Sequence, residues 1–231
     1  MPEASSRNRS TQSAPLRFAK IAWYELLRMM IHVAACAFYG CRTHGREHLP
    51  AEGGALLASN HQSHLDPPLI GQAIPRRINY LARTTLFRFF LFRWLIQSLD
   101  AIPIDRDGSG LGGIKETLKR LRRGEQVLMF PEGTRTPDGE IQPLKPGFCA
   151  IARRSRSPIV PLAIDGSFDA WPRKQRFPGR SVIHICFGPP ISIAQQQELS
   201  DDQLIRLVED RISECLKTAR TMRRRAMAGG I

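Results

Sequence analysis

Two histidines, a serine and a carboxylate stand together in the segment NHQSHLD, between an apolar run and two prolines. These side chains could form a general base, ligate a metal ion, or only hydrogen-bond within a polar turn. On a continuous helix His61 and Asp66 would lie about 140° apart around the axis. A loop between a strand that ends near Asn60 and a helix that begins at Asp66 and Pro67 can instead bring them together, since proline is favoured in the first turn of a helix.

A histidine held by a carboxylate is a general base, because the carboxylate accepts a hydrogen bond from one ring nitrogen and leaves the other to take a proton. No GxSxG pattern surrounds Ser63, so a substrate hydroxyl is a better proton source than this serine. His61, His64 and Asp66 could instead ligate zinc, but no fourth ligand stands at a familiar spacing and HExxH is absent from the sequence. We therefore predict base chemistry, with a metal site and a structural turn as alternatives.

Two cationic stretches each follow a predicted strand. AIPIDR ends in Arg106, and FPEGTRT carries Glu132, Gly133 and Arg135 on a tight turn. An arginine suits a phosphate because its planar fork offers paired donors, and a glycine lets backbone amides approach an anion closely. Beside a histidine base, these loops predict a site for a phosphorylated alcohol.

Short apolar runs alternate with amphipathic stretches along the middle of the chain. This alternation predicts a single α/β domain with a central mixed, largely parallel sheet flanked by helices. The carboxyl ends of the strands in such a sheet are where ligands usually bind. The predicted strands cover residues 54–59, 78–82, 101–104, 126–130, 159–164 and 182–187, and the predicted helices cover 86–99, 111–123, 147–154 and 201–225.

In their order along the chain, NHQSHLD, AIPIDR, FPEGTRT and IVPLAID resemble the four sequence blocks of the glycerolipid acyltransferase family. The resemblance covers about residues 45–190, and its first block is specific only together with FPEGTR. It implies transfer of an acyl group from acyl-CoA or acyl carrier protein to a hydroxyl of a glycerol phosphate, with no cofactor and no metal. A thioester is already activated, so such an enzyme needs a base and stabilisation of an oxyanion, but no covalent intermediate.

The resemblance also implies a role for eight residues. His61 takes the place of the general base and Asp66 orients it. Arg83, in LARTTLF, stands where relatives often carry lysine, although Thr85 replaces the acidic residue of that run. The other implied substrate-binding residues are Arg106 for phosphate, Glu132, Gly133 and Arg135 for the acceptor, and Pro161 for the acyl donor.

The acceptor implied by the resemblance is 1-acyl-sn-glycerol 3-phosphate, which would give phosphatidic acid for phospholipid biosynthesis. Glycerol 3-phosphate or another lyso-lipid, such as a lyso-ornithine lipid, is the alternative acceptor. A scaffold without turnover is disfavoured because both His61 and Asp66 are present.

The chain is strongly basic, with 34 Lys and Arg against 21 Asp and Glu among 231 residues, a net charge of +13. Such a surface attracts anionic lipid, phosphorylated substrates, an acidic carrier protein or nucleic acid. Nucleic-acid binding is disfavoured, because there is no aromatic-basic binding motif and the cations fall at strand ends and termini. The five scattered cysteines, with no CxxC pair, indicate a reducing compartment.

The N-terminal region predicts contact with a membrane. No secretory cleavage pattern is visible, and the apolar segment over residues 16–40 is interrupted by charges. Since a spanning helix needs roughly 20 mostly apolar residues, we predict a monotopic amphipathic helix on an anionic cytoplasmic membrane face. A terminal helix packed on the domain is the alternative. The predicted organisation is a disordered basic lead over 1–15, the amphipathic helix over 16–40, the catalytic domain over 41–200, and a C-terminal helix with a basic tail over 201–231.

Overall fold

The computed structural model describes residues 14–84, 90, 93–94, 96, 99, 101–104 and 111–229 of the chain. Arg106, most of the predicted lead and most of the predicted helix over 86–99 lie outside these residues. The remaining predicted helices and strands fall within them.

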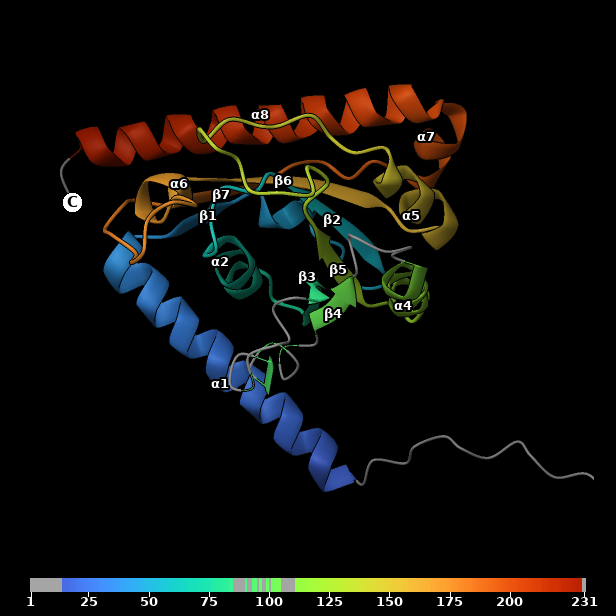
Figure 1. The fold of residues 1–231 in the computed structure, drawn as a ribbon, viewed down its shortest axis with the longest axis horizontal. Coiled ribbons are helices and arrows are strands. Elements are labelled where there is room, and N and C mark those ends of the chain that lie inside the picture. Colours follow the sequence, from blue (N-terminus) through green and yellow to red (C-terminus); the bar gives the residue numbers. More distant parts are fainter. Residues whose placement is uncertain are drawn as a thin grey trace, which may run out of the picture.

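Seven strands form one mixed sheet in the order β1-β7-β6-β2-β5-β3-β4 (Figure 1). Five of its six neighbouring pairs are parallel, while β6 and β7 are antiparallel. This arrangement confirms the predicted α/β fold. The strands are β1 (Arg42–His44), β2 (Ala55–Ser59), β3 (Ile78–Arg83), β4 (Ala101–Ile104), β5 (Gln126–Met129), β6 (Ile159–Asp165) and β7 (His184–Phe187).

Helices cover both faces of the sheet, which explains why β2, β5, β6 and β7 are buried along their whole length. One face packs against α4 (Leu111–Arg122), α5 (Gly147–Ser155) and the long α8 (Asp201–Ala228), which crosses the top of Figure 1. The other face packs against α2 (Asp66–Ala73) and part of α1 (Ala14–Tyr39). The shorter helical elements are the 3-10 helix η1 (Arg46–His48), α6 (Ser167–Ala170) and α7 (Ile193–Glu198).

The start of α8 follows from its sequence. Ser200 accepts a hydrogen bond from Gln203 N, and the Gln203 side chain accepts one from Ser200 N, which together form a capping box. Apolar side chains then recur at helical spacing and face the sheet. Basic residues gather at the other end, where the helix dipole favours positive charge.

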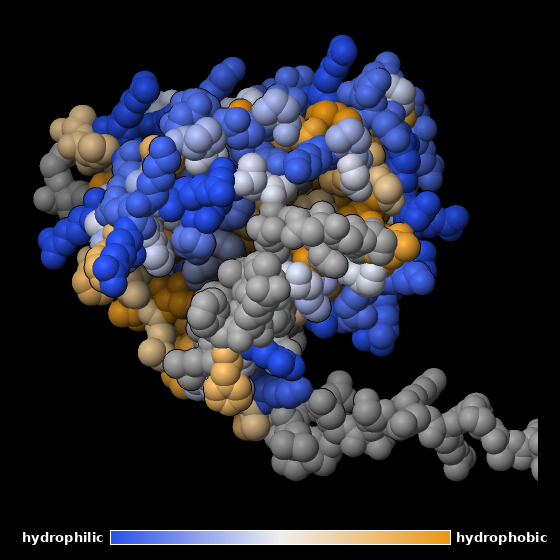
Figure 2. Space-filling model, in the orientation of Figure 1, coloured by the Kyte–Doolittle hydropathy of each residue, from blue (hydrophilic) through white to orange (hydrophobic). Residues whose placement is uncertain are grey.

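The helix α1 covers the predicted segment 16–40 and packs on the domain along a narrow face. The Tyr24 hydroxyl accepts a hydrogen bond from Ile78 N at 3.2 Å, and His32 Nδ1 lies 2.7 Å from Gln72 Oε1. The opposite face is apolar and exposed, with Met30 59% and Val33 58% accessible, and Figure 2 shows hydrophobic side chains gathered over this helix.

By length and composition, the 22 residues of Phe18–Tyr39 within α1 could cross a membrane, and 11% of the most apolar window is buried against the protein. The sequence prediction counted a shorter uninterrupted apolar run and favoured a helix on the membrane surface. The full helix is therefore compatible with a crossing as well as with an interfacial position.

Candidate active site

The loop between β2 and α2 brings the two main candidate residues together, as its strand end and helix start predict. His61 Nδ1 lies 2.8 Å from Asp66 Oδ2, although the residues are only five apart in the chain. With Asp66 ionised, the proton of the imidazole lies on Nδ1 and Nε2 is free to accept another. The pair sits at the carboxyl end of a central parallel strand, the usual position of a ligand site in this class of sheet.

Asp66 is completely buried, and four donors hold its carboxylate. Besides His61, the backbone N–H groups of Gln62 and Ser63 donate to Oδ2 at 2.6 and 2.7 Å. The Ser167 hydroxyl donates to Oδ1 at 2.6 Å. Buried polar groups need hydrogen-bond partners, and these four contacts fix the orientation of the Asp66 carboxylate.

Ser167 was not predicted from the sequence. It is 101 residues from Asp66 in the chain, at the start of α6, and none of the four sequence blocks contains it. The preceding Gly166 has φ 92°, and a Cβ there would lie 2.1 Å from the Val182 carbonyl oxygen. Only glycine fits this turn, which delivers Ser167 to the carboxylate.

The turn after β5 holds the other side of His61. Glu132 Oε1 accepts a hydrogen bond from His61 N at 2.7 Å, and Thr136 N donates to the His61 carbonyl at 2.8 Å. The imidazole stacks on Phe130, with ring centroids 3.9 Å apart. Backbone and ring are therefore both fixed, which is what a directed base requires.

Glu132 was predicted to bind the acceptor, but in the structure it contacts the backbone of the candidate base. Its second oxygen accepts from Gln142 N at 3.1 Å, so backbone donors occupy both oxygens. Burial raises the pKa of Glu132 to about 7, although these two hydrogen bonds act in the opposite direction. This geometry describes a residue that positions His61.

Arg135 has the features of an anion-binding residue. Its Nη1 is buried and has no hydrogen-bond partner in the described part of the chain. Burial lowers the pKa of this guanidinium, and the nearby charge of Arg173 acts in the same direction, while that of Asp66 opposes them. An unsatisfied guanidinium N–H beside a second cation would be stabilised by an anionic oxygen.

Gly133 gives this turn its shape. Its φ is 72°, in the left-handed region, and a Cβ there would lie 3.0 Å from Lys145 Cδ. A larger residue would therefore strain the turn that carries Glu132 and Arg135.

The remaining predicted residues are not brought to the pair by the contacts described. Arg83 ends β3 with its backbone paired to Ile104, while its side chain and the whole of Arg106 lie outside the described residues. Pro161 is buried inside β6, paired with Ala58, and its carbonyl accepts a hydrogen bond from Gly188 N at 2.8 Å.

The zinc alternative gains no support from this geometry. Among the described residues, no group of three or more His, Cys, Asp or Glu side chains is placed to hold a metal ion. The ring of His64 instead lies 5.4 Å from that of Trp171. Ser63 is no nucleophile in this arrangement, because its hydroxyl donates to the Trp171 carbonyl at 2.8 Å.

A family model for acyltransferases matches residues 40–165, more than half of the chain. This chain belongs to the acyltransferase family. The matched range contains the candidate residues His61, Asp66, Arg135 and Pro161.

Named members of the acyltransferase family are similar along much of the chain. The 1-acyl-sn-glycerol-3-phosphate acyltransferase of Bacillus subtilis is 30% identical over 179 residues, 77% of this chain and 87% of that protein. A chloroplastic enzyme of the same name from Brassica napus is 26% identical over 154 residues, 65% of this chain and 44% of that longer protein. The crystal structure of the acyltransferase PlsC from Thermotoga maritima superposes with a TM-score of 0.76 at 22% identity, over 91% of this chain and 85% of that one, which shows a shared fold.

Proposed function

We propose that this acyltransferase transfers a fatty acyl group from acyl-CoA or acyl carrier protein to the free hydroxyl of 1-acyl-sn-glycerol 3-phosphate, forming phosphatidic acid. The observation that carries the proposal is the 2.8 Å contact between His61 Nδ1 and Asp66 Oδ2, which leaves Nε2 as a base for an alcohol. The similar enzymes from Bacillus subtilis and Brassica napus are named for this acceptor, which supports the choice.

In the proposed reaction, His61 Nε2 takes the proton of the acceptor hydroxyl as the oxygen attacks the thioester carbonyl. A new C–O bond forms, and the carbonyl oxygen becomes an oxyanion. When the C–S bond breaks, the electron pair leaves with the thiolate, which recovers the proton from the imidazolium. The ionised Asp66 stabilises that imidazolium while it exists.

This route needs no cysteine nucleophile. Burial raises the pKa of Cys149 to about 11 and that of Cys41 to about 12, so both stay protonated thiols near neutral pH. We also expect turnover without any added metal or cofactor, because the thioester supplies the activated acyl group.

The phosphate of the acceptor would bind the guanidinium of Arg135, whose buried Nη1 lacks a partner in the described residues. Arg106 stays a further candidate for the phosphate, and Arg83 stays a candidate substrate-binding residue. Glu132 would act indirectly, by holding the backbone of His61. The predicted role of Pro161 in binding the acyl donor is supported only by its position in the fourth sequence block.

The exposed apolar face of α1 supports association with a membrane, where the acceptor resides. Together with the net charge of +13, this face favours an anionic lipid surface. We propose that the domain works at the cytoplasmic face, where acyl-CoA and acyl carrier protein are available.

The test is an assay of purified full-length protein in detergent, with three acceptors against each acyl donor. The acceptors are 1-acyl-sn-glycerol 3-phosphate, glycerol 3-phosphate and a lyso-ornithine lipid. We expect transfer to the first, unaffected by EDTA, and strongly reduced in Asp66→Asn, which keeps the shape of the carboxylate and removes its charge. Transfer to another acceptor alone would overturn the proposed substrate, and undiminished transfer in Asp66→Asn would overturn the mechanism.

A further inference from the structure

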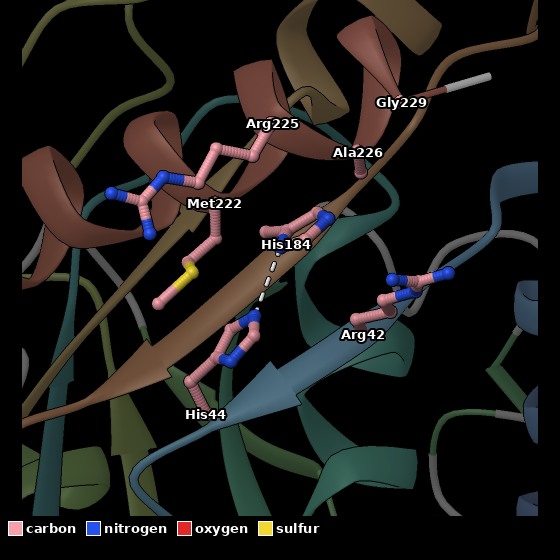
Figure 3. A pocket seen from close by; sticks show the side chains of 7 residues that line it. All are labelled: Arg42, His44, His184, Met222, Arg225, Ala226 and Gly229. Atoms are coloured by element: carbon pink, nitrogen blue, oxygen red, sulfur yellow. Dashed lines mark hydrogen bonds between the residues drawn. The ribbon is translucent and has the colours of Figure 1, made fainter. Parts of the chain in front are cut away.

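A second site lies at the edge of the sheet, away from His61. A pocket of about 330 Å³ is formed between β1, β7 and the last turns of α8 (Figure 3). None of the described residues of the proposed active site lines it. Its volume is at the lower end of the range for small-molecule sites, about 300–1,000 Å³, so it suits one small ligand or one headgroup.

Two histidines form the floor of this pocket. His44 Nε2 and His184 Nδ1 are 2.9 Å apart, and the rings stack with centroids separated by 5.1 Å. One proton occupies the bond between them, which leaves His44 Nδ1 and His184 Nε2 as the outer nitrogens. Burial lowers the pKa of His184 to about 4, helped by His44 and Arg42, so this ring is uncharged near neutral pH.

His184 is the unsatisfied member of the pair. The residue is 1% exposed, and its Nε2 has no hydrogen-bond partner in the described part of the protein. In Figure 3 this nitrogen is turned away from His44, towards Ala226 at the end of α8. A buried ring nitrogen without a partner is costly, and a ligand that accepts its proton would remove that cost.

The positive charge of the pocket comes from two arginines. Arg42 and Arg225 both line it, and no acidic residue does. Neither guanidinium has an ion-pair partner among the residues that the structure describes. By contrast, Arg220 and Arg223, earlier on α8, both pair with Asp165, at 3.4 and 3.3 Å.

We propose that this pocket binds the phosphate group of a phosphate monoester, with His184 Nε2 as a hydrogen-bond donor and with Arg42 and Arg225 as the charged contacts. In Figure 3 the two guanidiniums lie on opposite sides of the histidine pair, so binding requires these exposed side chains to turn inward. Two unpaired guanidiniums match the charge of a phosphate monoester, about −1.5 to −2 near pH 7, better than that of a single carboxylate. Binding would fix one tautomer, in which His184 carries its proton on Nε2 and His44 donates to His184 Nδ1. The ligand is either a soluble phosphate ester or the headgroup of a lipid, since both present the same chemistry.

Although the pocket is at the edge of the sheet, it lies towards the same end of the strands as the proposed active site. β7 runs antiparallel to β6, and its first residue, His184, pairs with Asp165 at the carboxyl end of β6. The inference does not depend on the acyltransferase reaction, because none of the described catalytic candidates takes part in it.

The test uses the full-length protein in detergent micelles, labelled with ¹⁵N-histidine, and inorganic phosphate as the probe. We expect phosphate to shift the imidazole signals of His44 and His184 and to give His184 the Nε2–H tautomer. Arg42→Gln and Arg225→Gln should each weaken phosphate binding about tenfold or more, as expected for loss of a charge-assisted hydrogen bond. Both side chains are exposed, so these variants should fold.

Arg206→Gln is the matched control, because it removes the same charge from an exposed position near the start of α8. The proposal is overturned if neither inorganic phosphate nor phosphatidic acid shifts the signals of His44 and His184, or if Arg206→Gln weakens binding as much as Arg225→Gln. It is also overturned if phosphate shifts only the signal of His61, since the anion would then occupy the proposed active site.

A second arm identifies the source of the phosphate. The protein is mixed with phosphatidylcholine vesicles that contain or lack phosphatidic acid, and the same imidazole signals are followed. Shifts that appear only with phosphatidic acid and depend on Arg225 assign a lipid headgroup. Shifts with inorganic phosphate but not with phosphatidic acid assign a soluble ester, and no shift with either ligand refutes the site.

Discussion

Glu132→Gln should remove a pH-dependent cost from the folding of this acyltransferase. The wild-type side chain is 2% exposed, and burial raises its pKa from 4.5 to about 7. Because the folded-state pKa lies above the unfolded value, the folded protein holds this proton more tightly than the unfolded chain. The protonated Glu132 side chain therefore makes its full contribution to stability below about pH 4.5, and this contribution is lost as the pH rises through about 7.

The size of the effect follows from the two pKa values. At about 1.4 kcal/mol per pKa unit, the change from 4.5 to about 7 corresponds to roughly 3 kcal/mol. Most of this change falls between pH 5 and pH 8. Glutamine does not titrate. Its amide NH₂ group would, however, face one of the two backbone N–H groups, of His61 or Gln142, that donate to Glu132 in the wild type. That mismatch costs about 1–3 kcal/mol at every pH.

The assay is urea unfolding of both proteins in detergent from pH 5 to pH 8. The variant should be less stable than wild type at pH 5, and the difference in unfolding free energy should shift in its favour by about 2–3 kcal/mol at pH 8. Other titrating groups contribute equally to both proteins, so they cancel in the difference between the two unfolding free energies. One such group is His184, whose pKa is lowered from 6.5 to about 4, so that its contribution to stability is lost as the pH falls. The same stability difference at pH 5 and pH 8 would refute the reasoning.

Three further predictions test the site and the membrane helix. Ser167→Ala removes one hydrogen-bond donor from Asp66. In steady-state kinetics kcat should therefore fall about tenfold, while KM for the acceptor stays the same. An unchanged kcat would contradict this. Gly133→Ala places a Cβ on a residue with φ 72°, so thermal unfolding should show that the protein is about 1–3 kcal/mol less stable. An unchanged Tm would contradict the claim that this turn requires glycine. The double variant Met30→Glu, Val33→Glu puts two charges on the exposed face of α1. Each charge costs about 2.5–3.5 kcal/mol if the centre of the helix inserts into the bilayer, so less protein should sediment with anionic vesicles. Undiminished sedimentation would place the membrane anchor elsewhere.

Local sequence was enough to predict most of the sheet and the loop that brings His61 to Asp66. The strands β2, β5 and β6 are continuous apolar runs because helices cover both of their faces. The proximity of His61 to Asp66 follows from a strand end, a Pro-marked helix start and a short loop between them. These signals depend only on neighbouring residues, so they can be recognised without knowledge of the rest of the fold.

Contacts between distant segments were not predictable in the same way. The strand β1 reads RTH, three polar residues whose pairing with β7 is set by the chain around them. Ser167 reaches Asp66 across 101 residues, and no local pattern marks it. The block FPEGTRT gave the position of Glu132 but not the direction of its side chain, which depends on how the turn packs against His61.

The most direct test of the central claim is the rate of labelled acyl transfer to 1-acyl-sn-glycerol 3-phosphate by His61→Ala, compared with wild type and with His64→Ala. His64 is the matched control, because it is a nearby histidine that packs against Trp171 instead of a carboxylate. The account predicts that His61→Ala lowers the rate by on the order of 10²- to 10⁴-fold, with an unchanged circular dichroism spectrum, while His64→Ala keeps most of the activity. A His61→Ala protein that turns over at the wild-type rate would contradict it.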